Sequence, residues 1–332
     1  MNASHWARPV LQSVLPVVES ARNVQTSIDA IHGVARWMAY EEFVFPSGSV
    51  GGDFDMGSDP DRIMDITLLE STLNFAFTDF DSGVKYEIEY EGRTCSDTEA
   101  MFARIHEAID AGIPMLHGDY LASITRADLE QIFHGNIEMP MLDERVAILN
   151  EVGATLVERY DGRFHRFVRE CAPAMYADGD GLLERLVVEF PRFDDVSDYH
   201  GAEVKIFKLA QLCLWSLHMS LHASREWQLR DLADMTAFAD YIVPVGLRVM
   251  GILEYTPDLE ERINNGVMIE RDSDEEIEIR AHTLYATALL TDAMNTIRPT
   301  DKQLVIAQTD HRLWRMYHTT FHPHHLTKTI MY

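Results

Sequence analysis

The chain has 332 residues, of which 46% are hydrophobic and 25% are charged, a composition typical of a globular protein with ample material for a core. Its 28 basic and 54 acidic side chains give a formal net charge of 28 − 54 = −26. Such an acidic protein repels a phosphate polymer unless it carries a basic groove, and the sequence has no basic run of that kind. We therefore expect no DNA partner. A small phosphorylated ligand remains possible, because a few lysines in a pocket can hold one phosphate.

The cysteines and the first residues of the chain predict a cytoplasmic protein. Cys95, Cys171 and Cys213 form no C-x-x-C pair, and such a sparse, odd set is not a disulfide framework. The N-terminal residues lack the charged-then-apolar pattern of a signal peptide. No apolar run approaches the length of a membrane span, so we expect no membrane partner.

The N-terminal part of the chain is predicted to form two helices followed by a loop. In residues 8–44, apolar residues recur at helical spacing, as at Val17, Ala21 and Val24. Residues 46–61 are rich in Gly, Ser, Asp and Pro, which predicts a loop. A mobile loop beside a binding site can serve as a lid.

One segment departs from the helical pattern and predicts a β-hairpin. Residues 72–77 and 84–90 alternate in polarity and are rich in aromatic side chains, and residues 79–83 resemble a turn. We therefore expect a hairpin that spans residues 72–90.

Helical patterns fill most of the remaining chain. Ser96 and Glu99 have the spacing of a capping box, which opens a predicted helix that ends near Gly112. Later helices are predicted at residues 142–159, 181–190, 204–223, 243–255, 275–297 and 301–318. The sequence has no repeat, low-complexity segment or long linker. It therefore predicts that residues 1–332 form one compact, mainly helical domain with a small sheet.

No Gly-rich phosphate loop, HExxH or GxSxG motif is present, so the chemistry has to come from weaker patterns. Asp240 follows Phe238 and precedes Tyr241 and Pro244, and proline suits the first turn of a helix. Asp240 is therefore either an ordinary helix-capping residue or a carboxylate at a pocket wall beside an aromatic ring. In the second case it can stabilise or attack the oxocarbenium-like state of a breaking glycosidic bond.

Asp310 and Trp314 are four residues apart and would share one helix face. A carboxylate can accept hydrogen bonds from the edge of a nucleobase, and an indole can stack on the base. An ion-paired surface aspartate and a core tryptophan would explain the same pair equally well.

Lys205 and Lys208 are three residues apart and would lie on one side of a helix. In so acidic a chain they are candidates for holding a phosphate, although a solvated helix face is the ordinary explanation of such a pair.

A histidine cluster near the C-terminus raises the alternative of a metal-dependent hydrolase built on His322, His324 and His325. Pro323 interrupts any helix there, and no carboxylate or cysteine lies at ligand spacing nearby. We therefore expect no metal ion and no cofactor.

Several short segments, weak individually, occur in a specific order from the predicted hairpin to the C-terminus. They are residues 72–75, 111–114, 141–145, 148–151, Lys208 with Ala210 and Gln211, residues 235–241, Glu276 with Glu278, Ile279 and Arg280, and Asp310 with Leu313 and Trp314. In this order they resemble the queuosine-salvage family, the queuosine 5′-phosphate N-glycosidases.

The resemblance implies a mainly helical enzyme with an architecture like that of helical DNA glycosylases. Its implied reaction is hydrolysis of queuosine 5′-monophosphate to queuine and ribose 5-phosphate, with queuine recovered for tRNA modification. Asp240 matches the central catalytic carboxylate of the family. Phe238, Asp310 and, by position, His311 match its base-binding residues. The family often has a tyrosine at the position of His311 and an acidic residue at that of Arg315.

Queuine is a 7-deazapurine and has carbon at position 7. It therefore cannot be protonated at N7, which is the usual way to activate a purine leaving group. Catalysis then depends more on stabilising the sugar cation, which is the role expected of Asp240. We expect Asp310 at the base edge or at the cationic side-arm amine. The other residues expected to contact substrate are Phe238 and Trp314 by stacking, Lys208 and Lys205 at the phosphate, and His311, Arg315, Asn74 and Tyr241.

Two other functions stay open at this point. One is a protein that binds queuine or a related nucleoside without cleaving it. The other is a broader nucleotide N-glycosidase that also accepts guanosine or adenosine monophosphate.

Overall fold

The computed structural model describes residues 4–43, 54–224, 226–318 and 320–332. Contacts group the chain into two compact units, between which the backbone passes several times. The first unit comprises Met1–Phe45, Asp195–Gln211 and Asp231–Lys328, and the second comprises Pro46–Asp194, Leu212–Arg230 and Thr329–Tyr332. The single domain over residues 1–332 stays a prediction.

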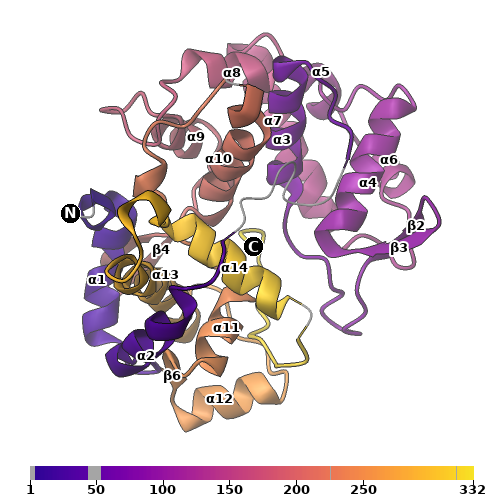
Figure 1. Cartoon of the computed structure of the whole chain (residues 1–332). Helices are drawn as coiled ribbons and strands as arrows, with labels where there is room; N and C mark the ends of the chain where they lie inside the picture. The colour runs from indigo at the N-terminus through magenta and orange to yellow at the C-terminus, as the bar shows by residue number, and fades with distance from the viewer. Residues whose placement is uncertain (1–3, 44–53, 225, 319) are drawn as a thin grey trace. The chain divides into compact units, whose positions relative to one another are not determined.

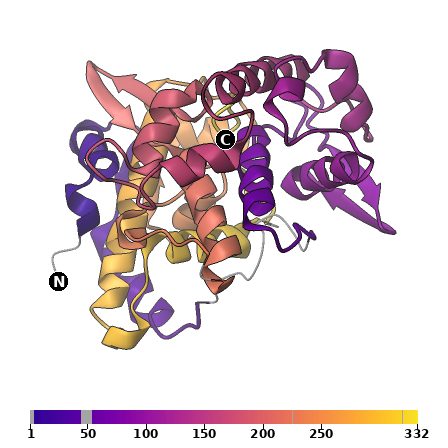
Figure 2. The ribbon, with the colours of Figure 1, turned by 90° about the horizontal axis from the view of Figure 1, so that it is seen from above.

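The first unit is built around one long helix, α13 (Asp274–Asn295), which lies beside α1 (Pro9–Ser20) and α2 (Ile28–Met38) (Figure 1, Figure 2). Most of its side chains are buried. A helix that is enclosed in this way belongs to a core, because its apolar and paired polar side chains meet other elements in every direction. The helices that pack against it are α1, α2, α11 (Val243–Val249) and α14 (Ile306–Tyr317).

Short elements complete the first unit. Strand β1 (Val24–Thr26) pairs antiparallel with β6 (Leu253–Tyr255), and β4 (Val196–Tyr199) pairs antiparallel with β5 (Ala202–Lys205). The other elements are α12 (Pro257–Asn264) and the short 3-10 helices η1 (Ser4–Ala7), η4 (Leu232–Asp234) and η5 (Thr300–Lys302).

The second unit is also mainly helical and contains one short hairpin. Its helices are α3 (Pro60–Leu73), α4 (Asp97–Asp110), α5 (Gly118–Leu121), α6 (Arg126–Ile132), α7 (Leu142–Arg159), α8 (Phe164–Glu170), α9 (Leu182–Glu189), η2 (Pro191–Phe193) and η3 (His222–Ser224). Helix α10 (Lys208–Leu221) begins in the first unit and ends in the second. None of the helices in the described part of the chain is both long and apolar enough to cross a membrane.

The mainly helical prediction is confirmed, and α7 has the predicted bounds. Two of the predicted helices are too long at one end. The helix predicted from residue 204 overlaps the end of strand β5 (residues 202–205), and the helix predicted to end at residue 255 overlaps strand β6 (residues 253–255). The first half of the predicted loop at residues 46–61, its residues 46–53, lies outside the described residues. The loop ends at Asp59, which caps α3 through a hydrogen bond from the Asp61 N–H.

The prediction of a hairpin over residues 72–90 is wrong in its position. Residues 72 and 73 finish α3, where the Thr72 hydroxyl donates to the carbonyl of Leu68. Burial on all sides of this helix removed the polar spacing that would have revealed it. The observed hairpin joins β2 (Glu87–Tyr90) to β3 (Arg93–Ser96) through Glu91 and Gly92, both with positive φ. This is the backbone that a two-residue hairpin turn requires.

The predicted turn at residues 79–83 does reverse the chain, but it is flanked only by an isolated bridge between Thr78 and Lys85. The predicted helix after Ser96 is confirmed as α4, whereas the prediction of a capping box at its start is wrong. The Ser96 side chain makes no capping hydrogen bond, and Glu99 pairs with Arg93 instead.

A close helix contact in the second unit predicts a large effect of one methyl group. Gly153 lies in the middle of α7, where an added Cβ would come within 2.3 Å of the Ala122 backbone nitrogen. We expect Gly153→Ala to lower the free energy of unfolding by about 1–3 kcal/mol through overpacking. Urea denaturation followed by circular dichroism measures this change.

Gly33, in the middle of α2, is the matched control because an added Cβ there meets nothing within 4 Å. Gly33→Ala should raise the free energy of unfolding by about 0.5–1 kcal/mol, since alanine favours the helix. Equal effects of the two substitutions would contradict the close contact at Gly153.

Candidate active site

Residues 235–242 of the first unit form an irregular segment between η4 and α11. Residues 235–240 are all buried, although they belong to no helix or strand. Buried backbone N–H and C=O groups outside regular structure need partners elsewhere in the molecule. Side chains from the surrounding helices supply them.

Three helices each fix one residue of this segment. Gln211 of α10 donates from Nε2 to the Thr236 hydroxyl (2.8 Å) and accepts from the Thr236 N–H (2.9 Å). Asp310 of α14 accepts from the Phe238 N–H (2.8 Å). Arg280 of α13 donates from Nε to the carbonyl of Ala239 (3.1 Å).

Asp240 stands at the end of the fixed segment and is 8% exposed. Its Oδ1 accepts hydrogen bonds from the N–H groups of Ile242 (2.8 Å) and Val243 (3.0 Å), at the start of α11. Pro244 lies in the first turn of that helix, as predicted. Oδ2 of Asp240 makes no hydrogen bond with any described residue. These two hydrogen bonds therefore orient the carboxylate and, among the described residues, engage only one of its two oxygens.

Asp310 is a second buried carboxylate, 3% exposed, that interacts with the first. Burial raises the pKa of Asp310 well above its usual range, and the charge of Asp240 raises it further. The hydrogen bond from the Phe238 N–H and the charge of Lys208 oppose this rise in pKa without cancelling it. Asp310 therefore keeps its proton to a higher pH than an exposed aspartate does.

The prediction that Lys205 and Lys208 share a helix side is wrong. Lys205 ends strand β5 and pairs with Glu203 (2.9 Å), whereas Lys208 begins α10 and is buried. The chain changes from strand to helix between them, with Phe207 in the left-handed region (φ 50°). The charge of Lys208 acts on Asp310.

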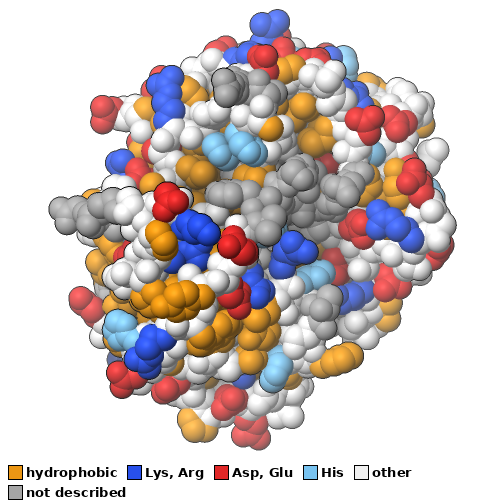
Figure 3. Space-filling model, in the orientation of Figure 1, with side chains coloured by type: hydrophobic (Ala, Val, Ile, Leu, Met, Phe, Trp, Pro, Cys, Tyr) orange, Lys and Arg blue, Asp and Glu red, His pale blue; other side chains and the backbone are white. Residues whose placement is uncertain are grey.

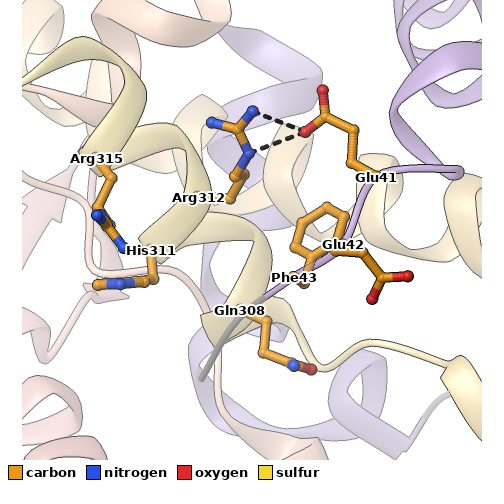
Figure 4. Close-up of a pocket in the computed structure, with 7 residues that line it drawn as sticks. All are labelled: Glu41, Glu42, Phe43, Gln308, His311, Arg312 and Arg315. Atoms are coloured by element: carbon orange, nitrogen blue, oxygen red, sulfur yellow. Dashed lines mark hydrogen bonds and ion pairs between the residues drawn. The ribbon is translucent and has the colours of Figure 1, made fainter. Parts of the chain in front are cut away.

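A cavity of about 520 Å³ lies along α14 in the first unit (Figure 4). The residues that line it are Glu41, Glu42, Phe43, Gln308, His311, Arg312 and Arg315. The Arg312 guanidinium holds Glu41 through two contacts of 2.9 and 2.8 Å, drawn as dashed lines in Figure 4. Burial, together with the charge of Arg315, lowers the pKa of His311 to about 4, so this imidazole is neutral at neutral pH.

The other aromatic residues predicted for the site have neighbours in the first unit. Phe238 is buried, and the Tyr241 ring lies 4.6 Å from the ring of His324. Trp314 packs against the core cluster and lies 4.3 Å from the ring of His318. The surroundings of Trp314 therefore favour the core explanation.

Comparison with known proteins identifies the family. Residues 55–332 match the sequence model of a family described as queuosine salvage protein. The chain belongs to the queuosine salvage protein family. The resemblance noted from the sequence is thereby confirmed.

Three relatives of the chain carry the same name, queuosine 5′-phosphate N-glycosylase/hydrolase. The protein of Sphaerobacter thermophilus is 33% identical over 327 residues, which cover 97% of each chain. The protein of Bos taurus is 29% identical over 67% of this chain and 65% of its own length. The protein of Schizosaccharomyces pombe is 29% identical over 70% of this chain and 69% of its own length.

In this queuosine salvage protein, all the predicted site residues except Asn74 belong to the first unit. Asn74 is the residue after α3 in the second unit, where its Oδ1 accepts a hydrogen bond from the Thr98 hydroxyl (3.0 Å). The roles proposed for these residues in substrate binding stay predictions.

The C-terminal histidines differ from one another in environment. His325 is buried, and its pKa is lowered to about 3, chiefly by burial. His324 lies against Tyr241, and His322 is exposed. Within the described ranges, no three His, Cys, Asp or Glu side chains gather in an arrangement that could hold a metal ion.

The cavity contains five residues that the sequence analysis did not select: Glu41, Glu42, Phe43, Gln308 and Arg312. A signal for two of them was present, because Gln308, His311, Arg312 and Arg315 follow the i, i+3, i+4, i+7 spacing of one helix face. The other three precede the part of the chain that matches the family, and no local pattern marks them.

The raised pKa of Asp310 predicts a pH-dependent effect of Asp310→Asn on stability. The unfolded chain ionises this carboxyl at a lower pH than the folded protein does, so the resulting loss of stability is absent below the unfolded pKa of about 4 and grows as the pH approaches the folded-state pKa. Asparagine carries no charge and can still accept from the Phe238 N–H. The stability of the variant relative to the wild type should therefore rise with pH, by at most about 1.4 kcal/mol per pH unit.

Urea denaturation of both proteins between pH 4 and pH 8 measures this difference. Asp301→Asn makes the same chemical change at an exposed residue before α14 and serves as the control. A stability difference for Asp310→Asn that stays constant with pH would contradict the raised pKa of Asp310.

Proposed function

We propose that this chain hydrolyses the N-glycosidic bond of queuosine 5′-monophosphate, releasing queuine and ribose 5-phosphate for the salvage of queuine into tRNA. Family membership and the shared name of the relatives support this reaction. The observation that carries the chemistry is the pair of buried, interacting carboxylates, Asp240 and Asp310, joined through the fixed segment at residues 235–242.

Asp240 works on the sugar side of the bond. When the bond between C1′ and the base nitrogen breaks, its electron pair leaves with the base and positive charge develops on the sugar ring. A carboxylate beside C1′ stabilises this charge or attacks C1′ directly. Water finally supplies hydroxide to C1′ and a proton to the base. The free Oδ2 of Asp240 is the oxygen that takes this role.

Asp310 works on the base side. A 7-deazapurine cannot be activated by protonation at N7, so hydrogen bonds to its remaining edge have more influence on departure of the base. An aspartate that retains its proton can donate such a hydrogen bond, and an ionised one can hold the side-arm ammonium. Both forms place Asp310 against the base or its side arm.

The remaining assignments concern substrate contacts. Phe238 and Tyr241 supply aromatic surface, and His311 and Arg315 reach the ligand from α14. Lys208 and Lys205 complete the set in the first unit, and both are assigned to the phosphate. The reaction needs neither a cofactor nor a metal ion in this proposal.

The proposed partners are the nucleotide and its free base, in the cytoplasm, with no DNA or membrane partner. On the face shown in Figure 3, Lys and Arg side chains lie scattered among Asp and Glu side chains. Together with the net charge of −26, this distribution favours a small ligand with a cationic side arm over a phosphate polymer.

Base release from four substrates tests the function. The protein is incubated without added metal with queuosine, queuosine 5′-monophosphate, guanosine monophosphate and adenosine monophosphate, and the free bases are quantified. We expect release from queuosine 5′-monophosphate. Release from the ordinary nucleotides as well would indicate a broader N-glycosidase, and binding without release from any of them would indicate a binding protein.

Asp240→Asn tests the catalytic residue. The amide can still cap α11 through its oxygen, but it loses the negative charge that faces the sugar, so kcat should fall on the order of 1,000-fold. Asp234→Asn is the control, since Asp234 is also buried and lies just before the fixed segment, but its carboxylate pairs with Arg8 (2.5 Å). Full activity in Asp240→Asn would contradict the assignment of Asp240 as the catalytic residue and would leave the proposed reaction unaffected.

A further inference from the structure

Arg280 lies about two turns into α13 and has no exposed surface. Its two terminal nitrogens donate to the two oxygens of Asp195, at 2.9 and 2.6 Å, and its Nε donates to the carbonyl of Ala239 at 3.1 Å. Asp195 is itself 1% exposed. One guanidinium therefore joins a buried carboxylate to the backbone of the segment that carries Asp240.

The hydrogen bond to Ala239 acts on the peptide group immediately before Asp240. This peptide is planar and includes both the Ala239 carbonyl and the Asp240 nitrogen. Fixing the direction of the carbonyl therefore fixes the plane from which the Asp240 side chain departs. The two hydrogen bonds to Oδ1 then fix the other end of the residue.

Asp195 extends the same connection to the start of α10. Its Oδ2 accepts from the N–H of Lys208 (3.2 Å), and its carbonyl accepts from the N–H groups of Ile206 (3.0 Å) and Phe207 (3.2 Å). The left-handed residue Phe207 is thus held by the backbone carbonyl of Asp195, and the first residue of α10 by the carboxylate that pairs with Arg280. Lys208, whose charge lowers the pKa of Asp310, is the first residue of α10 and is the residue whose N–H the Asp195 carboxylate holds.

We propose that Arg280 and Asp195 form a positioning pair that sets the direction of the Asp240 carboxylate for the reaction. The inference rests on the function proposed above. Neither residue has surface from which to contact substrate, so the pair acts through the peptide group between Ala239 and Asp240 and through the start of α10.

Only an arginine can make all of these contacts at once. Its planar fork presents two parallel donors to the carboxylate and a third donor, Nε, to a neighbouring group, whereas the lysine ammonium is a point charge on a flexible stem. Arg280→Lys therefore keeps the charge opposite Asp195 and loses the fixed geometry at Ala239. Asp195→Asn keeps the shape and loses the charge.

We expect Arg280→Lys to lower kcat by about 10- to 100-fold, the range typical of residues that orient a reacting group through one intermediate contact. The KM for queuosine 5′-monophosphate should change less than about threefold, because neither partner of the pair contacts substrate. Asp195→Asn should shift kcat in the same direction, which covers the case in which Arg280→Lys does not fold.

Glu278→Gln is the matched control. Glu278 lies on the same helix, is equally buried, and accepts hydrogen bonds from the N–H groups of Arg22, Asn23 and Val24, far along the chain from the Asp240 segment. This variant should lose stability and keep kcat. Circular dichroism at the assay temperature checks that each protein is folded before kcat and KM are measured.

A double-mutant cycle closes the experiment. If Arg280 acts through Asp240, Arg280→Lys should cause no further loss of kcat in an Asp240→Asn background. Loss of stability with an unchanged kcat in both Arg280→Lys and Asp195→Asn, or an additive loss in the double mutant, would overturn the positioning role while leaving the glycosidase reaction intact. No base release by the wild type would overturn the reaction and, with it, the positioning role.

Discussion

The candidate site depends on the requirement that buried backbone groups find hydrogen-bond partners. The segment at residues 235–242 leaves regular structure inside the first unit, so it cannot satisfy its own N–H and C=O groups as a helix does. Gln211, Asp310 and Arg280, from three different helices, supply the partners. A chain segment that would otherwise be free to move thereby holds a carboxylate in a fixed place.

Two buried carboxylates of the first unit, Asp195 and Asp310, differ in how far their negative charge is compensated. Asp195 faces a guanidinium that satisfies both of its oxygens, an arrangement that holds structure. Asp310 receives one backbone hydrogen bond and the partial compensation of Lys208, while the charge of Asp240 opposes its ionisation. An incompletely compensated carboxylate responds strongly to a bound ligand, which is typical of groups that take part in binding and catalysis.

The sequence predicted those helices that are buried on one face only, because their apolar side chains recur at helical spacing between polar ones. Helix α7 was predicted within its bounds, whereas α3 was missed because nearly every side chain in its second half is buried. Asp240 could be selected as a candidate from its place before Pro244 and from the family resemblance. The contact of Arg280 with Ala239 was not, because it joins residues 41 positions apart through side-chain geometry that no local spacing encodes.

The capping of α11 by Asp240 bears on the fate of a covalent intermediate. If Oδ2 attacks C1′, the side chain becomes an ester, and Oδ1 becomes its carbonyl oxygen. The amides of Ile242 and Val243, already bonded to that oxygen, would then polarise the ester carbonyl. They would also make the carboxylate a better leaving group when water attacks the sugar carbon. Two amides that define the start of a helix in the resting protein would thus help to release the sugar.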